Sequence, residues 1–186
     1  MDASVERELL TSARSGDQAA FALLVEQYRD LVLSLAFQMT GSAADMDDLA
    51  QETFFRAYRN LGGFRGEATL KTWLVKIVMN LSSNYRRARK IQVGTDAAEA
   101  LALTSPAQEQ DRRILSDELR GMVRRAVAEL PAHYRSVVVL RDFQSLRYEE
   151  IAGVLGIPVG TVMSRLAKAR GLLRDGLAPY YGMGPF

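Results

Sequence analysis

Cysteine is absent from this chain of 186 residues, and histidine occurs once. A disulfide framework and a thiolate zinc site are therefore excluded, and we expect no metal or catalytic site built from histidines. The longest nearly apolar stretch, residues 31–37, is far shorter than the roughly 20 residues of a membrane helix. The acidic N-terminus, MDASVEREL, lacks the basic lead and apolar core of a secretory signal. These absences predict a chain with no metal, no cofactor and no membrane insertion, at work in the reducing cytoplasm.

The composition is that of a soluble globular protein, with 48% hydrophobic and 25% charged residues. Ala, Leu, Glu and Arg dominate, apolar residues recur every three or four positions, and no segment alternates strictly between apolar and polar. The predicted fold class is therefore all-α. The length suits two compact units as well as one.

Turn and capping signals divide this helical pattern into segments. We expect helices over 3–14, 17–40, 42–61, 70–89, 107–130, 132–142, 147–155 and 159–177. Ser42 with Asp45 is typical of a capping box, and Ser105-Pro106 followed by Gln108 marks a sharp new start. The sequence thus predicts two small helical domains, 1–90 and 106–178, joined by a flexible linker, 91–105, and followed by a tail, 179–186.

Charge is unevenly distributed along the chain, although the net charge is only +2. Residues 1–55 carry ten acidic and three basic side chains, whereas residues 56–90 carry nine basic and one acidic. Such asymmetry predicts a polyanionic partner for the basic block and a different partner for the acidic block. The alternative is that both blocks merely keep helix faces in contact with water.

The clearest local pattern spans residues 148–170, which predict two short helices around a tight turn at Gly156. This spacing is typical of a helix-turn-helix, whose second helix enters the DNA major groove by its N-terminal end. The open face of the second helix carries candidate groups for phosphates or base edges: Thr161, Ser164, Arg165, Lys168 and Arg170. Arginine fits guanine O6 and N7, whereas Lys168 suits a phosphate. The alternative is a helical hairpin that packs against another surface.

The expected helix 70–89 combines an apolar face with an aromatic and basic margin. Its apolar face is formed by Leu74, Ile77, Val78, Leu81 and Tyr85. The opposite side and the preceding loop offer a stacking surface, amides and cations, which are what unpaired bases need. These candidates are Phe64, Arg65, Trp73, Lys76, Asn80, Asn84 and Arg87. The alternative is that Trp73 only closes the hydrophobic core.

Residues 45–58 predict a helix with an acidic outer face. We expect the inner face to consist of Met46, Ala50, Thr53, Ala57 and Leu61. The outer face carries Asp48, Gln51, Glu52, Phe55 and Arg59. An outward aromatic ring within a charged rim indicates a protein interface. A solvated face is the alternative.

Three motifs, in this order and spacing, make the chain similar to bacterial RNA polymerase sigma factors of the sigma-70 family. They are DLAQETF at residues 48–54, TWL at 72–74 with Asn80, and LP at 130–131 ahead of the helix-turn-helix. The chain resembles the short extracytoplasmic-function (ECF) type, which has only the domains called sigma-2 and sigma-4. The resemblance covers nearly the whole chain.

This resemblance implies a role for each group of residues. Asp48, Gln51 and Glu52 match the surface that grips the clamp helices of the polymerase large subunit. Trp73 and Asn80, with the 62–68 loop, match the part that opens the −10 element and holds its non-template strand. The last helix matches the reader of the −35 element. The implied partners are bacterial core RNA polymerase, promoter DNA and an anti-sigma factor, and the chain itself would carry no catalytic residue.

Two other functions stay open at this point. One is a helix-turn-helix regulator that binds DNA without being a polymerase subunit. The other is an all-α nucleotide pyrophosphohydrolase, because Glu26 with Asp30 and Asp48 with Glu52 could present carboxylates to Mg²⁺ from two helices.

The chain also departs from the family pattern at two places in the helix-turn-helix. Met163 stands where members commonly carry a basic residue, which puts one DNA contact in doubt. Arg147 stands where a small hydroxyl residue often caps the first helix, and Ser145 is the candidate substitute.

Overall fold

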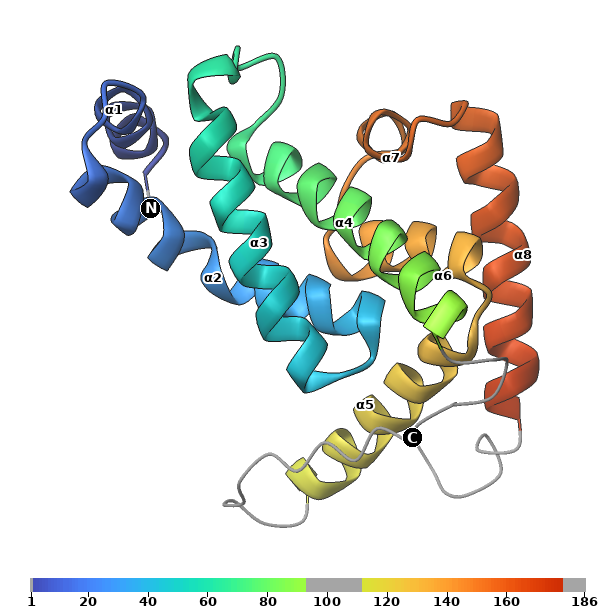
Figure 1. The fold of residues 1–186 in the computed structure, drawn as a ribbon. Coiled ribbons are helices and arrows are strands. Elements are labelled where there is room, and N and C mark those ends of the chain that lie inside the picture. Colours follow the sequence, from blue (N-terminus) through green and yellow to red (C-terminus); the bar gives the residue numbers. More distant parts are fainter. Residues whose placement is uncertain (1, 93–111, 179–186) are drawn as a thin grey trace. The chain divides into compact units, whose positions relative to one another are not determined.

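The computed structural model describes residues 2–92 and 112–178, with side chains for residues 2–83 and 119–178. The chain divides into two compact units, Met1–Thr95 and Asp96–Phe186. Every regular element in the described residues is helical, which confirms the predicted all-α class (Figure 1).

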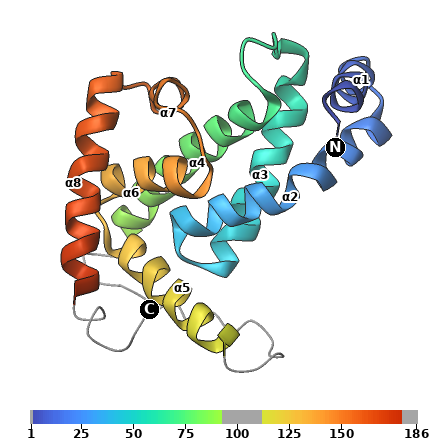
Figure 2. The same ribbon diagram turned by 180° about the vertical axis from the view of Figure 1, so that it is seen from behind.

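The first unit is built around one long helix. Its elements are α1 (Ala3–Arg14), α2 (Gln18–Thr40), α3 (Ala43–Asn60), a 3-10 turn (Leu61–Gly63) and α4 (Leu70–Gln92). Helix α2 packs against α1, α3 and α4, and α3 also packs against α4 (Figures 1 and 2). The core of the unit therefore lies between α2, α3 and α4.

The ends of α2 and α3 follow the predicted signals. The Asp17 carboxylate accepts hydrogen bonds from the backbone N–H of Ala19 at 2.9 Å and of Ala20 at 3.1 Å, so Asp17 caps α2. Gly41 ends this helix in the left-handed conformation, with φ of 79°. The Ser42 hydroxyl then accepts from the N–H of Asp45 at 3.3 Å, which confirms the cap predicted for α3.

Helix α4 is buried over a wider face than its apolar spacing predicts. Leu74 and Val78 are buried as expected, but Val75 and Met79 are buried too. Both α2 and α3 cover α4, so a second row of its side chains is excluded from water. On α3 four of the five residues predicted for the inner face, Ala50, Thr53, Ala57 and Leu61, are buried, and Met46 is half-buried.

Helix α1 packs against α2 through a side-chain hydrogen bond and through apolar contacts. The Tyr28 hydroxyl donates a hydrogen bond to the Glu6 carboxylate. Burial, followed by this hydrogen bond and the Glu6 charge, raises the pKa of the Tyr28 phenol above its usual value. Leu9 and Leu10 pack against the buried cluster that includes Leu24. Helix α1, which precedes the core helices α2, α3 and α4 in the sequence, is therefore part of the first unit.

The second unit is organised around its last helix. Its elements are α5 (Arg112–Glu129), α6 (Ala132–Val138), a π-helical turn (Val139–Phe143), α7 (Tyr148–Leu155) and α8 (Val159–Leu177). Helix α8 packs against α5, α6 and α7. The helical segment predicted over 132–142 is continuous, but from Val139 its backbone widens into the π-helical turn.

The predicted connection between the units is only partly described. Helix α4 extends to Gln92, beyond the predicted end at residue 89 and into the segment expected as linker. The remainder of the 91–105 linker, the start signal at residues 105–108 and the 179–186 tail lie outside the described residues.

Candidate protein and nucleic-acid interfaces

Helix α3 presents an acidic face with one aromatic ring. Asp48, Gln51 and Phe55 are exposed, and 55% of Phe55 is accessible to solvent. Thr53 and Ala57, on the opposite side of the helix, are buried. The structure therefore brings the predicted residues of the protein interface together on one outer face, with Glu52 at its half-buried edge.

Two arginines of α3 accompany this face: Arg59, which the sequence predicts there, and Arg56, which the sequence reasoning missed. Arg56 donates to the Glu52 carboxylate at 2.6 Å, and both side chains remain partly exposed. The Arg59 guanidinium lies 5.6 Å from the centre of the Phe55 ring. The signal was available in the sequence, because residues four apart are neighbours on a helix surface. Both arginines limit how strongly acidic this surface is.

Trp73, on α4, lies half-buried at the edge of the first core. Its ring centre is 5.1 Å from that of Phe64, with the ring planes tilted by 46°. Phe64 itself is only 9% exposed. The candidate Phe64 is therefore placed in the core as a support for the indole ring, and it is not on the open surface.

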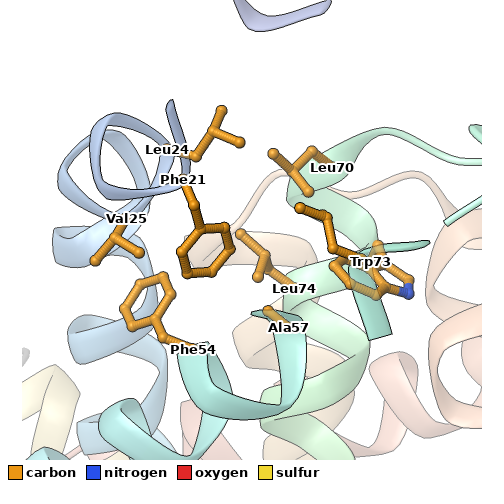
Figure 3. Close-up of a pocket in the computed structure, with 9 residues that line it drawn as sticks. Phe21, Leu24, Val25, Phe54, Ala57, Leu70, Trp73 and Leu74 are labelled. Atoms are coloured by element: carbon orange, nitrogen blue, oxygen red, sulfur yellow. The ribbon is translucent and has the colours of Figure 1, made fainter. Parts of the chain in front are cut away.

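The inner side of Trp73 borders an apolar pocket in the first unit. Figure 3 shows Trp73 at one edge of it, opposite Phe21 and Phe54, with Leu74 between them. The indole nitrogen points away from these rings. Trp73 thus does close the core, as the alternative predicts, and its nitrogen-bearing edge is turned away from the other pocket residues.

The outer side of α4 carries the remaining polar candidates. Lys76 and Asn80 are exposed, and residues 73, 76 and 80 fall on one side of a helix with 3.6 residues per turn. This Trp73–Lys76–Asn80 stripe combines a ring, a cation and an amide. Arg65, in the loop before α4, is also exposed. The side chains of Asn84 and Arg87 lie outside the described residues.

The loop before α4 ends in a cap that the sequence reasoning did not identify. The Thr69 hydroxyl accepts from the N–H of Thr72 at 3.2 Å, and the Thr69 carbonyl accepts from the N–H of Trp73 at 3.0 Å. The signal was a threonine just ahead of the first apolar residue of the helix. This cap fixes the first turn of α4 and with it the position of Trp73.

Helices α7 and α8 form the predicted helix-turn-helix. Their axes are bent by 102° across a short break, and Gly156 makes the turn with φ of 65°. Ile151, Val162 and Leu166 are buried between the helices and α6. The backbone N–H of Arg147 donates to the Glu150 carboxylate at 2.8 Å. The Glu150 side chain, and not Ser145, therefore caps the N-terminus of α7.

The open face of α8 contains four of the five predicted DNA-binding residues. Ser164 and Lys168 are exposed, and Thr161 and Arg165 are half-buried. The spacing places Ser164 and Lys168 opposite Val162 and Leu166, and Thr161 and Arg165 on the flank next to Val162. Residues 161 and 164 lie in the first two turns, near the end that can enter a groove.

Arg170 is separated from this set. It lies about 140° around α8 from Arg165, and its guanidinium donates to the Asp142 carboxylate at 2.9 Å. That hydrogen bond and the Asp142 charge raise the pKa of Arg170 above its usual value. The contact ties α8 to the π-helical turn, so Arg170 is engaged inside the unit rather than free.

The described part of the chain contains no group of three or more His, Asp or Glu side chains that could hold a metal ion. Within it, the pyrophosphohydrolase alternative has no three-carboxylate group on which to build. In residues 2–92 and 112–178, no single helix is long and apolar enough to cross a membrane, and α7 with α8 passes that test only as a sharply bent pair.

Comparison with known proteins places both units in one family. Residues 24–91 match the family model for sigma-70 region 2, and residues 120–173 match that for sigma-70, region 4. The RNA polymerase sigma-H factor of Pseudomonas aeruginosa is 35% identical over 182 residues, which cover 94% of each chain. The ECF RNA polymerase sigma-E factor of Escherichia coli K12 is 37% identical over 94% of this chain and 95% of that protein. The structure of CnrH with the cytosolic domain of CnrY matches at a TM-score of 0.68 and 26% identity, over 94% of this chain and 98% of that one.

Proposed function

Because the chain belongs to the sigma-70 family of RNA polymerase sigma factors, we propose that it is an ECF sigma factor with one task for each unit. It binds core RNA polymerase, directs it to promoters with −35 and −10 elements, and stabilises the opened −10 strand. The observation that carries this proposal is that each unit displays its own exposed set of polar and basic side chains on a helix. One is the Trp73–Lys76–Asn80 stripe on α4, and the other is the helix-turn-helix.

The acidic face of α3 is the polymerase-binding surface in this proposal. Asp48, Gln51 and Glu52 supply the polar rim, and the exposed Phe55 supplies an apolar anchor. Anchors of this kind, surrounded by polar groups, carry most of the binding energy of protein interfaces. Arg56 contacts Glu52 and Arg59 contacts Phe55, so polymerase must either bind beside these arginines or displace them.

The stripe on α4 captures bases of the −10 element. A base can stack on the outer side of Trp73 while Asn80 bonds its edge and Lys76 meets the backbone. Arg65 contributes charge from the loop, and Asn84 and Arg87 extend the same helix. Phe64 acts indirectly, because its buried ring holds Trp73 in place. Each stacked base supplies roughly 1–3 kcal/mol toward strand opening.

Helix α8 reads the −35 element as duplex DNA. Arg165 and Ser164 are the candidates for base edges, and Thr161 and Lys168 for phosphates. Arg170 is proposed as a further phosphate contact that must compete with Asp142. In this scheme the chain contributes binding and positioning, and the polymerase contributes the catalytic groups.

A protein inhibitor, the anti-sigma factor, is a further partner in the proposal. Its support is the family resemblance. The related CnrH was determined with the cytosolic domain of another protein, CnrY, bound to it.

Reconstituted transcription tests the proposed function most directly. Bacterial core polymerase is supplied with a library of genomic fragments, with and without the purified chain, and the 5′ ends of the transcripts are mapped. We expect the chain to create start sites that core polymerase alone does not use. Tight duplex binding without polymerase, combined with no new start sites, would instead identify a helix-turn-helix regulator.

A further inference from the structure

One apolar side chain stands out on the open side of α8. Met163 is 53% exposed, although it is the only large hydrophobic residue so exposed among the described residues of this helix. It lies one turn from the start of α8 at Val159, within the part of a recognition helix that approaches base edges. Met163 lies about 100° around the helix from Ser164, on the opposite flank of the open face from Arg165, so it adds an apolar group at the edge of the proposed DNA-binding surface.

The surroundings of Met163 leave its side chain room to reach outward. Residues three before and four after it are Gly160 and Ala167, both small and exposed. Long side chains on a helix lie over the preceding turn, which for Met163 is the turn of Gly160. A Cβ added at Gly160 would meet no atom within 4 Å, so nothing in the described part of the chain requires glycine there. A glycine that costs helix stability fits a position that another molecule approaches closely.

The chemistry of the groove narrows what Met163 can recognise. A thioether offers no hydrogen-bond donor and only a weak acceptor, so it cannot read the polar pattern of a base. The C5-methyl of thymine is the apolar group that unmodified base pairs present in the major groove. Methionine is flexible enough to pack on such a methyl without an ideal fit.

We propose that Met163 packs against the C5-methyl of one thymine in the duplex element bound by α8 and makes that position selective for thymine. The inference rests on the proposed function, because it assumes that α8 reads duplex DNA. It adds a specificity determinant that Arg165 and Ser164 do not provide, since a methyl group cannot be recognised by their hydrogen bonds.

Deoxyuridine tests this contact, because it differs from thymidine only by the missing methyl. The promoter is one selected by the full chain with core polymerase. Each thymine of its upstream element is replaced singly by deoxyuridine on either strand, and holoenzyme affinity is measured by competition. We expect one replacement to weaken binding by the wild type roughly fourfold, the ratio that one buried methyl-sized group supplies. The same replacement should leave the affinity of the Met163→Ala holoenzyme unchanged.

Two further variants sharpen the result. Met163→Leu keeps an apolar side chain and should keep part of the discrimination. Val5→Ala removes another exposed apolar side chain, 43% accessible and in the other unit, and should respond to deoxyuridine as the wild type does. Because Met163 and Val5 are exposed, neither change should unfold its helix.

Several results would overturn the inference. One is that Met163→Ala responds to every deoxyuridine replacement as the wild type does; another is that the variant weakens thymine and deoxyuridine templates equally. An upstream element without a thymine would also exclude it. If the holoenzyme selects start sites and one of these results is obtained, only this inference fails. If no start site is selected, the proposed function fails first and takes the inference with it.

Discussion

The two units differ in how their candidate nucleic-acid surfaces relate to their cores. In the first unit, Trp73 belongs to both, because one side of its ring packs on the core and the other borders the polar stripe of α4. In the second unit the tasks are divided, since Val162 and Leu166 fill the core while Ser164 and Lys168 face outward. Changes at the first surface should therefore alter stability and function together, and changes at the second should alter function alone.

This difference suits the two kinds of DNA. Holding an unpaired base requires a flat apolar surface that is fixed against rotation, which packing on Phe64 supplies. Reading paired bases requires side chains that reach out of a rigid helix into a groove. A core residue can do the first task, whereas the second needs residues that the core does not use.

Replacing Trp73 with alanine should have the largest effect. We expect the free energy of unfolding of the first unit to fall by about 3 kcal/mol, together with loss of permanganate reactivity at the −10 thymines. Leu74→Ala is the matched control, because Leu74 is buried beside the same pocket but has no outer surface. It should lose comparable stability and still open promoters at temperatures where it is folded. If both variants opened promoters equally poorly, the effect of Trp73 would be explained by its part in the core alone.

Arg165→Ala should affect binding without affecting stability. If Arg165 reads a base, duplex binding at the −35 element should weaken by about 1–3 kcal/mol, and unfolding should change by less than about 0.5 kcal/mol. Footprinting with holoenzyme measures the first quantity and urea unfolding the second. Arg174→Ala, exposed near the other end of α8, serves as the control. An unaltered −35 footprint would remove Arg165 from the reading surface.

Glu52→Lys should weaken association with core polymerase by roughly tenfold, a loss of about 1.4 kcal/mol. Stability should change little, because the ion pair with Arg56 is partly exposed and such pairs contribute about 0.3–0.5 kcal/mol. Glu8→Lys makes the same charge change on an exposed position of α1. Normal co-purification of the Glu52 variant with polymerase would argue that α3 is not the docking face.

Tyr28→Phe should have the smallest effect, confined to the first unit. Loss of the hydrogen bond to Glu6 should lower the free energy of unfolding by about 1 kcal/mol at neutral pH. Because the pKa of Tyr28 is raised in the folded chain, its contribution is complete below pH 10 and is lost as the pH rises further. Urea unfolding of both proteins at pH 8 and above pH 10 should show the difference shrinking. A difference that does not depend on pH would contradict the contact.

Much of the fold could be predicted because it depends on local signals. Helix periodicity located the inner face of α3, and Ser42 and Gly156 marked a cap and a turn that the structure confirms. The burial of Val75 and Met79 could not be predicted, because the apolar spacing of one helix does not tell how many neighbours cover it.

The candidate surfaces were predictable to a similar degree. The helix-turn-helix was recognised because its turn and its buried residues are close together in the sequence. Phe64 was misplaced because a loop has no periodicity to show which side chain turns inward. The Arg170–Asp142 contact joins residues 28 positions apart, so it depends on the path of the chain through the π-helical turn.

Helix α4 runs without a break from Leu70 to Gln92, so it fixes the distance between Trp73 and residue 86. With a rise of about 1.5 Å per residue, the helix carries its backbone about 20 Å from Trp73 to residue 86, where a cluster of arginines begins. That length equals about six steps along one strand of a duplex at roughly 3.4 Å each. In the proposed complex this helix would therefore fix the distance between a base stacked on Trp73 and the DNA contacted from residue 86 onward.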